Sequence, residues 1–301
     1  MKNIFYIIIV FFLFSCKDDE KSEAVKNEDI NNSEVIKSNK NENYNISVFI
    51  DLSDRIDTVK YANPSMEYYQ RDIGYIKSIS EAFLNHIRNK KIIRLNDKIQ
   101  VFFNPNPLNP EINNISKKLK IKVDKSSATK EFINKISKSY EFETSKIYSL
   151  AINDNKYIGS DIWNFFQNNI NDYCIEDNHR NILVILTDGY IYYKDSNYRQ
   201  ENQSTYLTPE LIRSYNLNNK DWKVSMEAKK IGYLKANDDL SNLEILVLGI
   251  NPSIKNPYEG KVIKEFWSNW FKEMKVKRFE IKETALPSNM DKVIKDFIEN
   301  K

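Results

Sequence analysis

The stretch NILVILTDGY, residues 181–190, decides the class of fold. Residues 182–186 form a nearly continuous apolar run, which is typical of a strand covered on both faces of a parallel sheet. A polar TDG turn follows at once, so the expected strand ends in a loop that carries an acidic side chain. In open α/β sheets, functional residues gather outside the carboxyl ends of the strands. We therefore expect chemistry at the end of this strand.

Four further apolar runs are bounded by polar residues, at 46–50, 99–103, 243–248 and 276–281. Helical spacing of apolar residues separates them, over 69–87 and 263–274, and a last helix is expected to begin at Ser288. Regular alternation of strand and helix is typical of a sheet covered on both faces. The sequence therefore predicts an α/β fold of three layers, Rossmann-like, with a mostly parallel central sheet of about six strands flanked by helices.

Two segments depart from this alternation and are expected to be insertions, at about 104–158 and 190–240. The first opens with NPNPLNP and continues with a short alternating run and a short helix around Phe132 and Ile136, beside the main sheet. The second is rich in tyrosine and then contains Thr208-Pro209-Glu210, a helix start. We expect the tyrosines to form a contact rim near the site.

The N-terminus, MKNIFYIIIVFFLFSC, has the layout of a secretory signal, with Lys2, an apolar run over 4–14 and Cys16. The run is shorter than the roughly 20 residues of a spanning helix, and an uncleaved signal-anchor is the alternative. Residues 13–16 resemble the bacterial lipobox, which implies cleavage before Cys16 and acylation of its thiol. Residues 17–20, KDDE, resemble a surface-sorting signal or simply begin a tether. We expect a lipid-anchored protein of the bacterial cell envelope, either in the periplasm or on the surface of the outer membrane.

Residues 17–45 are polar with a single aromatic, and they are predicted to form a disordered linker before one domain at 46–301. The 45 basic and 42 acidic residues are spread along the chain without a dense basic stripe, so we do not expect nucleic acid as a partner. Of the two cysteines, Cys174 would have no disulfide partner if Cys16 is acylated, and it is expected to be buried.

Three polar segments stand at expected strand ends or helix starts, ISVFIDLSDRID at 46–57, IGSDIWNFF at 158–166 and TDG at 187–189. Together they resemble the von Willebrand factor A family and its metal-ion-dependent adhesion site, over roughly residues 46–300. The resemblance implies Asp51, Ser53, Ser160 and Asp188 as the metal site, with Mg²⁺ as the ion and Mn²⁺ or Ca²⁺ as alternatives. It also implies that an acidic partner residue completes the coordination of the ion.

Arg55 departs from the family pattern, which has a second serine at that position. Its guanidinium could pair with Asp51 and Asp188 and take the place of the cation, or Asp54 could hold it away. We expect three residues to modulate the site, namely Asp54, Arg55 and Asp161, which follows Ser160.

Each segment also has a simpler interpretation. Asp188-Gly189 between apolar runs is a strong hairpin signal, with 190–193 as the returning strand. Residues 51–54 could be a polar turn, and Ser160 could be the N-cap of the following helix.

The sequence favours a binding module over an enzyme. The two histidines, His86 and His179, lie away from the expected strand ends, and the chain has six glycines and no Gly-x-Ser-x-Gly elbow. We expect a protein that binds an envelope or surface protein and reaches the membrane through its lipid. The alternatives are a metal-dependent hydrolase that uses Asp51 and Asp188, and a structural subunit with a decayed metal site.

Overall fold

The computed structural model describes residues 42–300 and builds them around a sheet of six strands in the order β3-β2-β1-β4-β8-β9. All neighbours are parallel except the edge pair β2 and β3. The predicted α/β fold with a mostly parallel, helix-flanked sheet is therefore confirmed. The strands are β1 (Asn43–Ile50), β2 (Asn96–Phe102), β3 (Ile121–Asp124), β4 (His179–Leu186), β8 (Leu243–Ile250) and β9 (Arg278–Glu283).

Strands β1 and β4 form the centre of the sheet and end side by side. In their parallel register Val48 lies opposite Val184 and Ile50 opposite Leu186. Both strands are buried almost throughout because helices cover both faces. Consequently the residues that follow them, Asp51 and Thr187, are adjacent in space.

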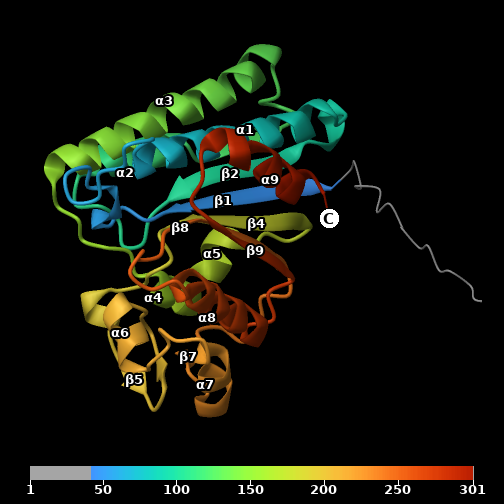
Figure 1. Cartoon of the computed structure of the whole chain (residues 1–301). Coiled ribbons are helices and arrows are strands. Elements are labelled where there is room, and N and C mark those ends of the chain that lie inside the picture. The colour runs from blue at the N-terminus through green and yellow to red at the C-terminus, as the bar shows by residue number, and fades with distance from the viewer. Residues whose placement is uncertain (1–41, 301) are drawn as a thin grey trace, which may run out of the picture. The chain divides into compact units, whose positions relative to one another are not determined.

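Helices cover the two faces of the sheet (Figure 1). One face carries α1 (Tyr68–Arg88), α2 (Pro110–Lys118), α3 (Lys130–Asp154) and α9 (Pro287–Glu299). The other carries α4 (Ile162–Asn168), α5 (Ile170–Cys174) and α8 (Glu259–Glu273). Each face has its own apolar core, and alternate residues of β1 and β4 contribute to one or the other. Short 3₁₀ turns stand at Asp54–Ile56, Ile92–Arg94 and Lys194–Ser196.

The segment 104–158 belongs to the main fold more closely than predicted. Strand β3 joins the sheet as its edge, and α3 runs for 25 residues where a short helix was expected. The buried face of α3 is a narrow stripe that includes Ile136, Tyr140, Thr144 and Ile147, interrupted in sequence by many charged residues. Its length is therefore supported by packing on α1 rather than by a broad apolar pattern.

The segment 190–240 forms a small sheet of three short strands beside α8, β5 (Arg199–Gln200), β6 (Gln203–Ser204) and β7 (Gly232–Tyr233). It also holds α6 (Pro209–Ser214), which begins at the predicted helix start with Thr208 as its N-cap, and α7 (Trp222–Lys229). The hairpin interpretation of Asp188-Gly189 is wrong, because Ile191 pairs with Leu207 and not with β4.

Two predicted boundaries move by a few residues. Strand β1 begins at Asn43, so the expected linker ends before residue 45, and Tyr44 is buried against the ring of His86. The last helix begins at Pro287 with Leu286 as its N-cap, not at Ser288. Cys174 is buried as predicted, and burial raises the pKa of its thiol to about 12.

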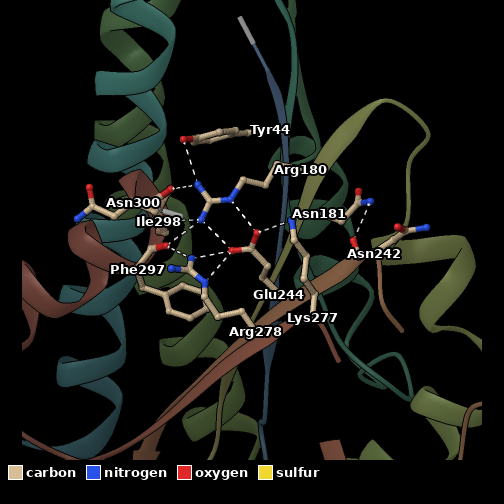
Figure 2. Close-up of polar contacts among 10 residues, drawn as sticks. All are labelled: Tyr44, Arg180, Asn181, Asn242, Glu244, Lys277, Arg278, Phe297, Ile298 and Asn300. Atoms are coloured by element: carbon tan, nitrogen blue, oxygen red, sulfur yellow. Dashed lines mark hydrogen bonds and ion pairs between the residues drawn. The ribbon is translucent and has the colours of Figure 1, made fainter. Parts of the chain in front are cut away.

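The amino ends of the strands are closed by a buried charge cluster (Figure 2). Arg180 on β4 contacts Glu244 on β8 through two bonds of 3.0 and 2.8 Å, and Arg278 on β9 contacts the same carboxylate at 2.6 Å. Both arginines also donate to the carbonyl of Phe297, and Arg180 donates to that of Asn300. The cluster therefore ties the end of α9 to three strands.

The predicted signal sequence, Cys16 and nearly all of the predicted linker lie outside residues 42–300. Within that range no helix is long and apolar enough to cross a membrane.

Candidate functional site

The carboxylate of Asp51 is the point where three loops meet. Ser160 donates to its Oδ1 at 2.7 Å, and Thr187 donates to its Oδ2 at 3.0 Å. The backbone N–H of Ser53 also donates to Oδ1, at 2.9 Å. Residues from the ends of β1 and β4 and from the loop before α4 therefore converge on one buried carboxylate.

Ser160 lies two residues before α4 but does not cap it. The N-cap is Asp161, whose side chain accepts from the backbone N–H of Asn164 at 3.2 Å. Its other oxygen accepts from Ser196 at 2.5 Å, which ties the 190–240 segment to this loop. The N-cap interpretation of Ser160 is thus wrong. Asp161, expected as a site modulator, is instead occupied by cap and loop contacts.

The side chain of Arg55 is 5% exposed and contacts the ends of β1 and β4. Its Nε donates to the carbonyl of Asp51 at 3.0 Å and lies 3.6 Å from that residue's Oδ2. Its Nη2 donates to the carbonyl of Leu186 at 3.1 Å and to the carboxylate of Asp72 at 2.5 Å. Burial lowers the pKa of a guanidinium, but Asp72 and Asp51 outweigh this effect and raise the pKa of Arg55 above its ordinary value. Arg55 is therefore a permanent charge at the site.

Asp72, on α1, is a site residue that the sequence reasoning missed. Besides Arg55, its carboxylate accepts from the hydroxyl of Tyr148 on α3 at 2.9 Å. A signal was present, because Asp72 stands four residues before Ile76 and so falls on the apolar face of the predicted helix. A buried aspartate in that position needs a cationic partner.

Asp188 has a different environment. It is half-buried, and its Oδ1 accepts from the backbone N–H of Tyr190 at 3.1 Å. Desolvation by its surroundings, together with the nearby charge of Asp51, raises the pKa of Asp188 to about 7, which Arg55 only partly offsets. Gly189 follows with φ of +96°, and an added Cβ would approach side chains of Ile250 and Ile263 to 2.6 and 2.7 Å. Only glycine therefore suits this sharp turn.

Asp54 does not hold Arg55 away. Its carboxylate pairs with Lys60 in the same loop, and both side chains are about half exposed to solvent. Asp54 and Arg55 are thus separated, with Arg55 buried and Asp54 on the surface.

A cleft of about 460 Å³ opens above Arg55 and Asp188. Its walls come from the loops after β1, β4 and β8, and from the starts of α1 and α6. They include Tyr61, Tyr68 and Tyr190, and the acidic residues Asp54 and Glu210. A second hollow of about 330 Å³ lies on the other side of Ser160 and is lined largely by apolar residues and prolines.

Exposed apolar side chains lie on the loops that follow β1, β2, β4, β8 and β9 and on the loop between α3 and α4, and we call them the rim. The rim residues are Val59, Tyr61, Leu108, Ile158, Tyr192, Tyr198, Ile254 and Leu286. Ile254 is 99% exposed, and Tyr192 and Tyr198 come from the tyrosine-rich segment that was expected to form a contact surface.

The residues around Asp51 suit a bound divalent ion poorly. The guanidinium of Arg55 stands 3.6 Å from Asp51, where it supplies positive charge and would repel a second cation. Asp51, Ser53, Ser160 and Asp188 nevertheless belong to the same end of the sheet, as the sequence predicted.

Comparisons with known proteins do not name a family for this chain. No protein-family description and no curated protein matches it. Among solved structures, the chain is similar to the pilus adhesin SpaC from Lactobacillus rhamnosus GG, with a TM-score of 0.38 and 10% identity over 85% of this chain and 30% of the adhesin. It is also similar to proximal thread matrix protein 1 from the mussel byssus, with a TM-score of 0.33 and 10% identity over 86% of this chain and 46% of the other. The chain thus spans less than half of either protein.

Proposed function

We propose that the chain is a binding protein that recognises a protein or surface ligand through the loops at the carboxyl ends of its strands. The observation that carries the proposal is the coincidence of three features on one end of the sheet. These are the convergence on Asp51, the cleft beside Asp188 and the exposed apolar rim. Apolar and tyrosine side chains that stay exposed beside polar groups are typical of interaction sites.

We propose further that the domain is a von Willebrand factor A-like domain in which Arg55 takes the place of the ion's charge. Support comes from the strand order, the positions of Asp51, Ser160 and Asp188, and the contacts of Arg55. This proposal keeps the predicted binding role. For the site it adopts the alternative in which the guanidinium of Arg55 replaces the metal ion. The predicted lipid anchor at Cys16 and the envelope location remain part of the proposal.

The test of the binding role is site-specific photo-crosslinking in cells that make the protein naturally. A photoreactive phenylalanine analogue replaces Tyr192 or Ile254 on the rim, and Ile92 or Phe142 as matched exposed positions elsewhere. Adducts of one defined mass from the rim positions alone support the proposal. Adducts that form equally at Ile92 and Phe142, or none from the rim, contradict it.

The test of the metal question is the melting temperature of the full-length protein during titration with Mg²⁺, Mn²⁺ or Ca²⁺. An ion at 100 times its dissociation constant would add about 2.7 kcal/mol to the free energy of unfolding. We expect no shift, because Arg55 is already bonded to Asp51 and Asp72. An increase in melting temperature with the ion that is absent in Asp188→Asn would support a metal site and refute the proposal that Arg55 replaces the ion.

The same protein preparations distinguish the hydrolase alternative from the binding role. Purified protein incubated with phosphoesters and Mg²⁺ or Mn²⁺ is expected to show no turnover, because Asp51 already accepts hydrogen bonds from Ser160, Thr187 and Ser53 and lies beside the guanidinium of Arg55. Turnover that Asp51→Ala abolishes would favour the enzyme.

A further inference from the structure

The amino end of the sheet, opposite to the rim, exposes two adjacent isoleucines. Ile92 and Ile93 open the 3₁₀ turn between α1 and β2 and are 55% and 73% exposed. Strands β1, β2 and β4 run parallel, so the turn before β2 lies at the edge of the sheet where these strands begin. Each exposed isoleucine would gain free energy by leaving water. The pair therefore forms a surface that favours an apolar neighbour.

A buried ion pair fixes the turn at its base. Lys90 contacts Asp97 at 2.6 Å, and both side chains are almost fully buried. The backbone N–H of Leu95 donates to the carbonyl of Ile92 at 3.2 Å and closes the turn. The two isoleucines therefore point outward from a part of the fold that is held in place.

The segments that form this end carry an excess of positive charge. Residues 88–97 and 121–135 hold eight basic and three acidic side chains, whereas the whole chain is nearly balanced at 45 and 42. Strand β3 ends with Asp124 opposite Asn96, which brings the two segments together. Each of the three acidic side chains faces a lysine of the same segments. Three exposed lysines form no ion pair with residues 42–300, namely Lys91, Lys125 and Lys130.

The described part of the chain begins beside the same turn. The Nζ of Lys90 donates to the carbonyl of Glu42 at 3.0 Å and to the side chain of Asn43 at 2.7 Å. Residues 1–41, which include Cys16 as the predicted site of acylation, therefore join the domain next to the exposed isoleucines. A lipid on that segment would draw this end of the domain, and not the rim, toward a membrane.

We infer that the amino end of the domain docks on an anionic phospholipid bilayer. Ile92 and Ile93 enter the headgroup region, and the three exposed lysines lie near the lipid phosphates. Two aliphatic side chains bind a bilayer weakly by themselves, and adjacent positive charge adds electrostatic attraction. The inference goes beyond the proposed binding role and does not depend on it. Docking in this orientation turns the rim away from the bilayer and leaves it open to a partner.

The experiment measures contact with lipid in the full-length protein, reconstituted in vesicles. A photoreactive phenylalanine analogue replaces Ile93, and in a matched protein it replaces Val224, which is 68% exposed on α7. The vesicles are phosphatidylcholine, either alone or mixed with phosphatidylglycerol, and mass spectrometry measures the fraction of the labelled peptide that carries lipid. The N-terminal segment is the same in both proteins, so its own attachment cannot produce a difference between them.

With phosphatidylglycerol present, we expect at least about fivefold more lipid adduct at Ile93 than at Val224, and loss of this excess in phosphatidylcholine alone. Three results overturn the inference. These are equal adduct at the two positions, an excess that persists without phosphatidylglycerol, and crosslinks between two copies of the chain in place of lipid.

Two charge variants test the contribution of the lysines. Lys91→Gln with Lys130→Gln removes two positive charges beside the isoleucines, and Lys220→Gln with Lys255→Gln removes the same charge from exposed positions elsewhere. We expect the lipid adduct at Ile93 to fall at least about fivefold in the first variant and to stay unchanged in the second. All four lysines are exposed, so the melting temperatures should stay the same. Equal adduct in the two variants refutes the role of this surface.

This inference and the proposed function fail separately. Rim crosslinks to a protein, without lipid adducts at Ile93, leave the binding role standing and refute the docking surface. Lipid adducts at Ile93 without specific rim crosslinks leave the docking surface standing and refute the binding role.

Discussion

Replacing Glu244 by glutamine tests how much the buried charge cluster of Figure 2 stabilises the fold. The side chain is 3% exposed and contacts Arg180, Arg278 and Lys277. Burial alone would raise the pKa of Glu244, but these three cations outweigh it and lower the pKa from 4.5 to about 2. That difference corresponds to about 3 kcal/mol in the free energy of unfolding at neutral pH.

The sign of the pH dependence follows from the lowered pKa. The stabilisation is complete above pH 4.5, where the carboxylate is ionised even in the unfolded chain, and is lost as pH falls through about 2. The difference between unmodified protein and Glu244→Gln is therefore expected to shrink from about 3 kcal/mol near pH 7 to about 1 kcal/mol near pH 3. The expected loss is of the size seen when one partner of a buried pair is removed.

The assay is urea unfolding of the full-length protein at the two pH values, followed by circular dichroism. Glu280→Gln is the matched control, because Glu280 pairs with Lys282 at the surface of the same sheet and is expected to change stability by less than about 1 kcal/mol. A Glu244→Gln variant as stable as the control at neutral pH, or a difference that grows in acid, would refute the reasoning.

Three further changes probe the site. Asp72→Asn leaves the buried guanidinium of Arg55 without its closest carboxylate and is expected to cost about 3–5 kcal/mol by urea unfolding, whereas retention of stability would mean that Asp51 suffices. Ser160→Ala removes one hydrogen bond to Asp51 and is expected to cost about 1.5–3 kcal/mol, while an unchanged midpoint would show that the bond contributes nothing. Asp188→Asn removes a carboxylate whose pKa is raised from 3.8 to about 7, so the unmodified protein loses stability as pH rises from 3.8 to about 7 and the variant does not. The melting temperature of the variant should exceed that of the unmodified protein near pH 8, and the difference should shrink as pH falls and vanish below 3.8; the opposite order would contradict the raised pKa.

Much of the architecture follows from local patterns. The apolar runs at 182–186 and 243–248 are confirmed as β4 and β8, and the periodic residues between 69 and 87 as α1. The long helix α3 was underestimated because its buried stripe is narrow, and the turn at Asp188-Gly189 was ambiguous because a hairpin uses the same residues. Both errors arise where the deciding contacts come from other segments of the chain.

The sequence by itself determined that polar residues follow β1 and β4 directly, and hence that Asp51 and Asp188 stand at one end of a parallel sheet. An apolar run and the polar residues that follow it are adjacent in the sequence, so they show where a strand ends. The alternation of strands with helices indicates that the strands are parallel and that their carboxyl ends lie at one edge. Only the tertiary structure decided what surrounds those carboxylates. Asp72 reaches Arg55 because α1 packs over the end of β1, and Asp54 turns outward to Lys60. The charge balance of the site depends on which helix face lies over which strand, and residue spacing does not contain that information.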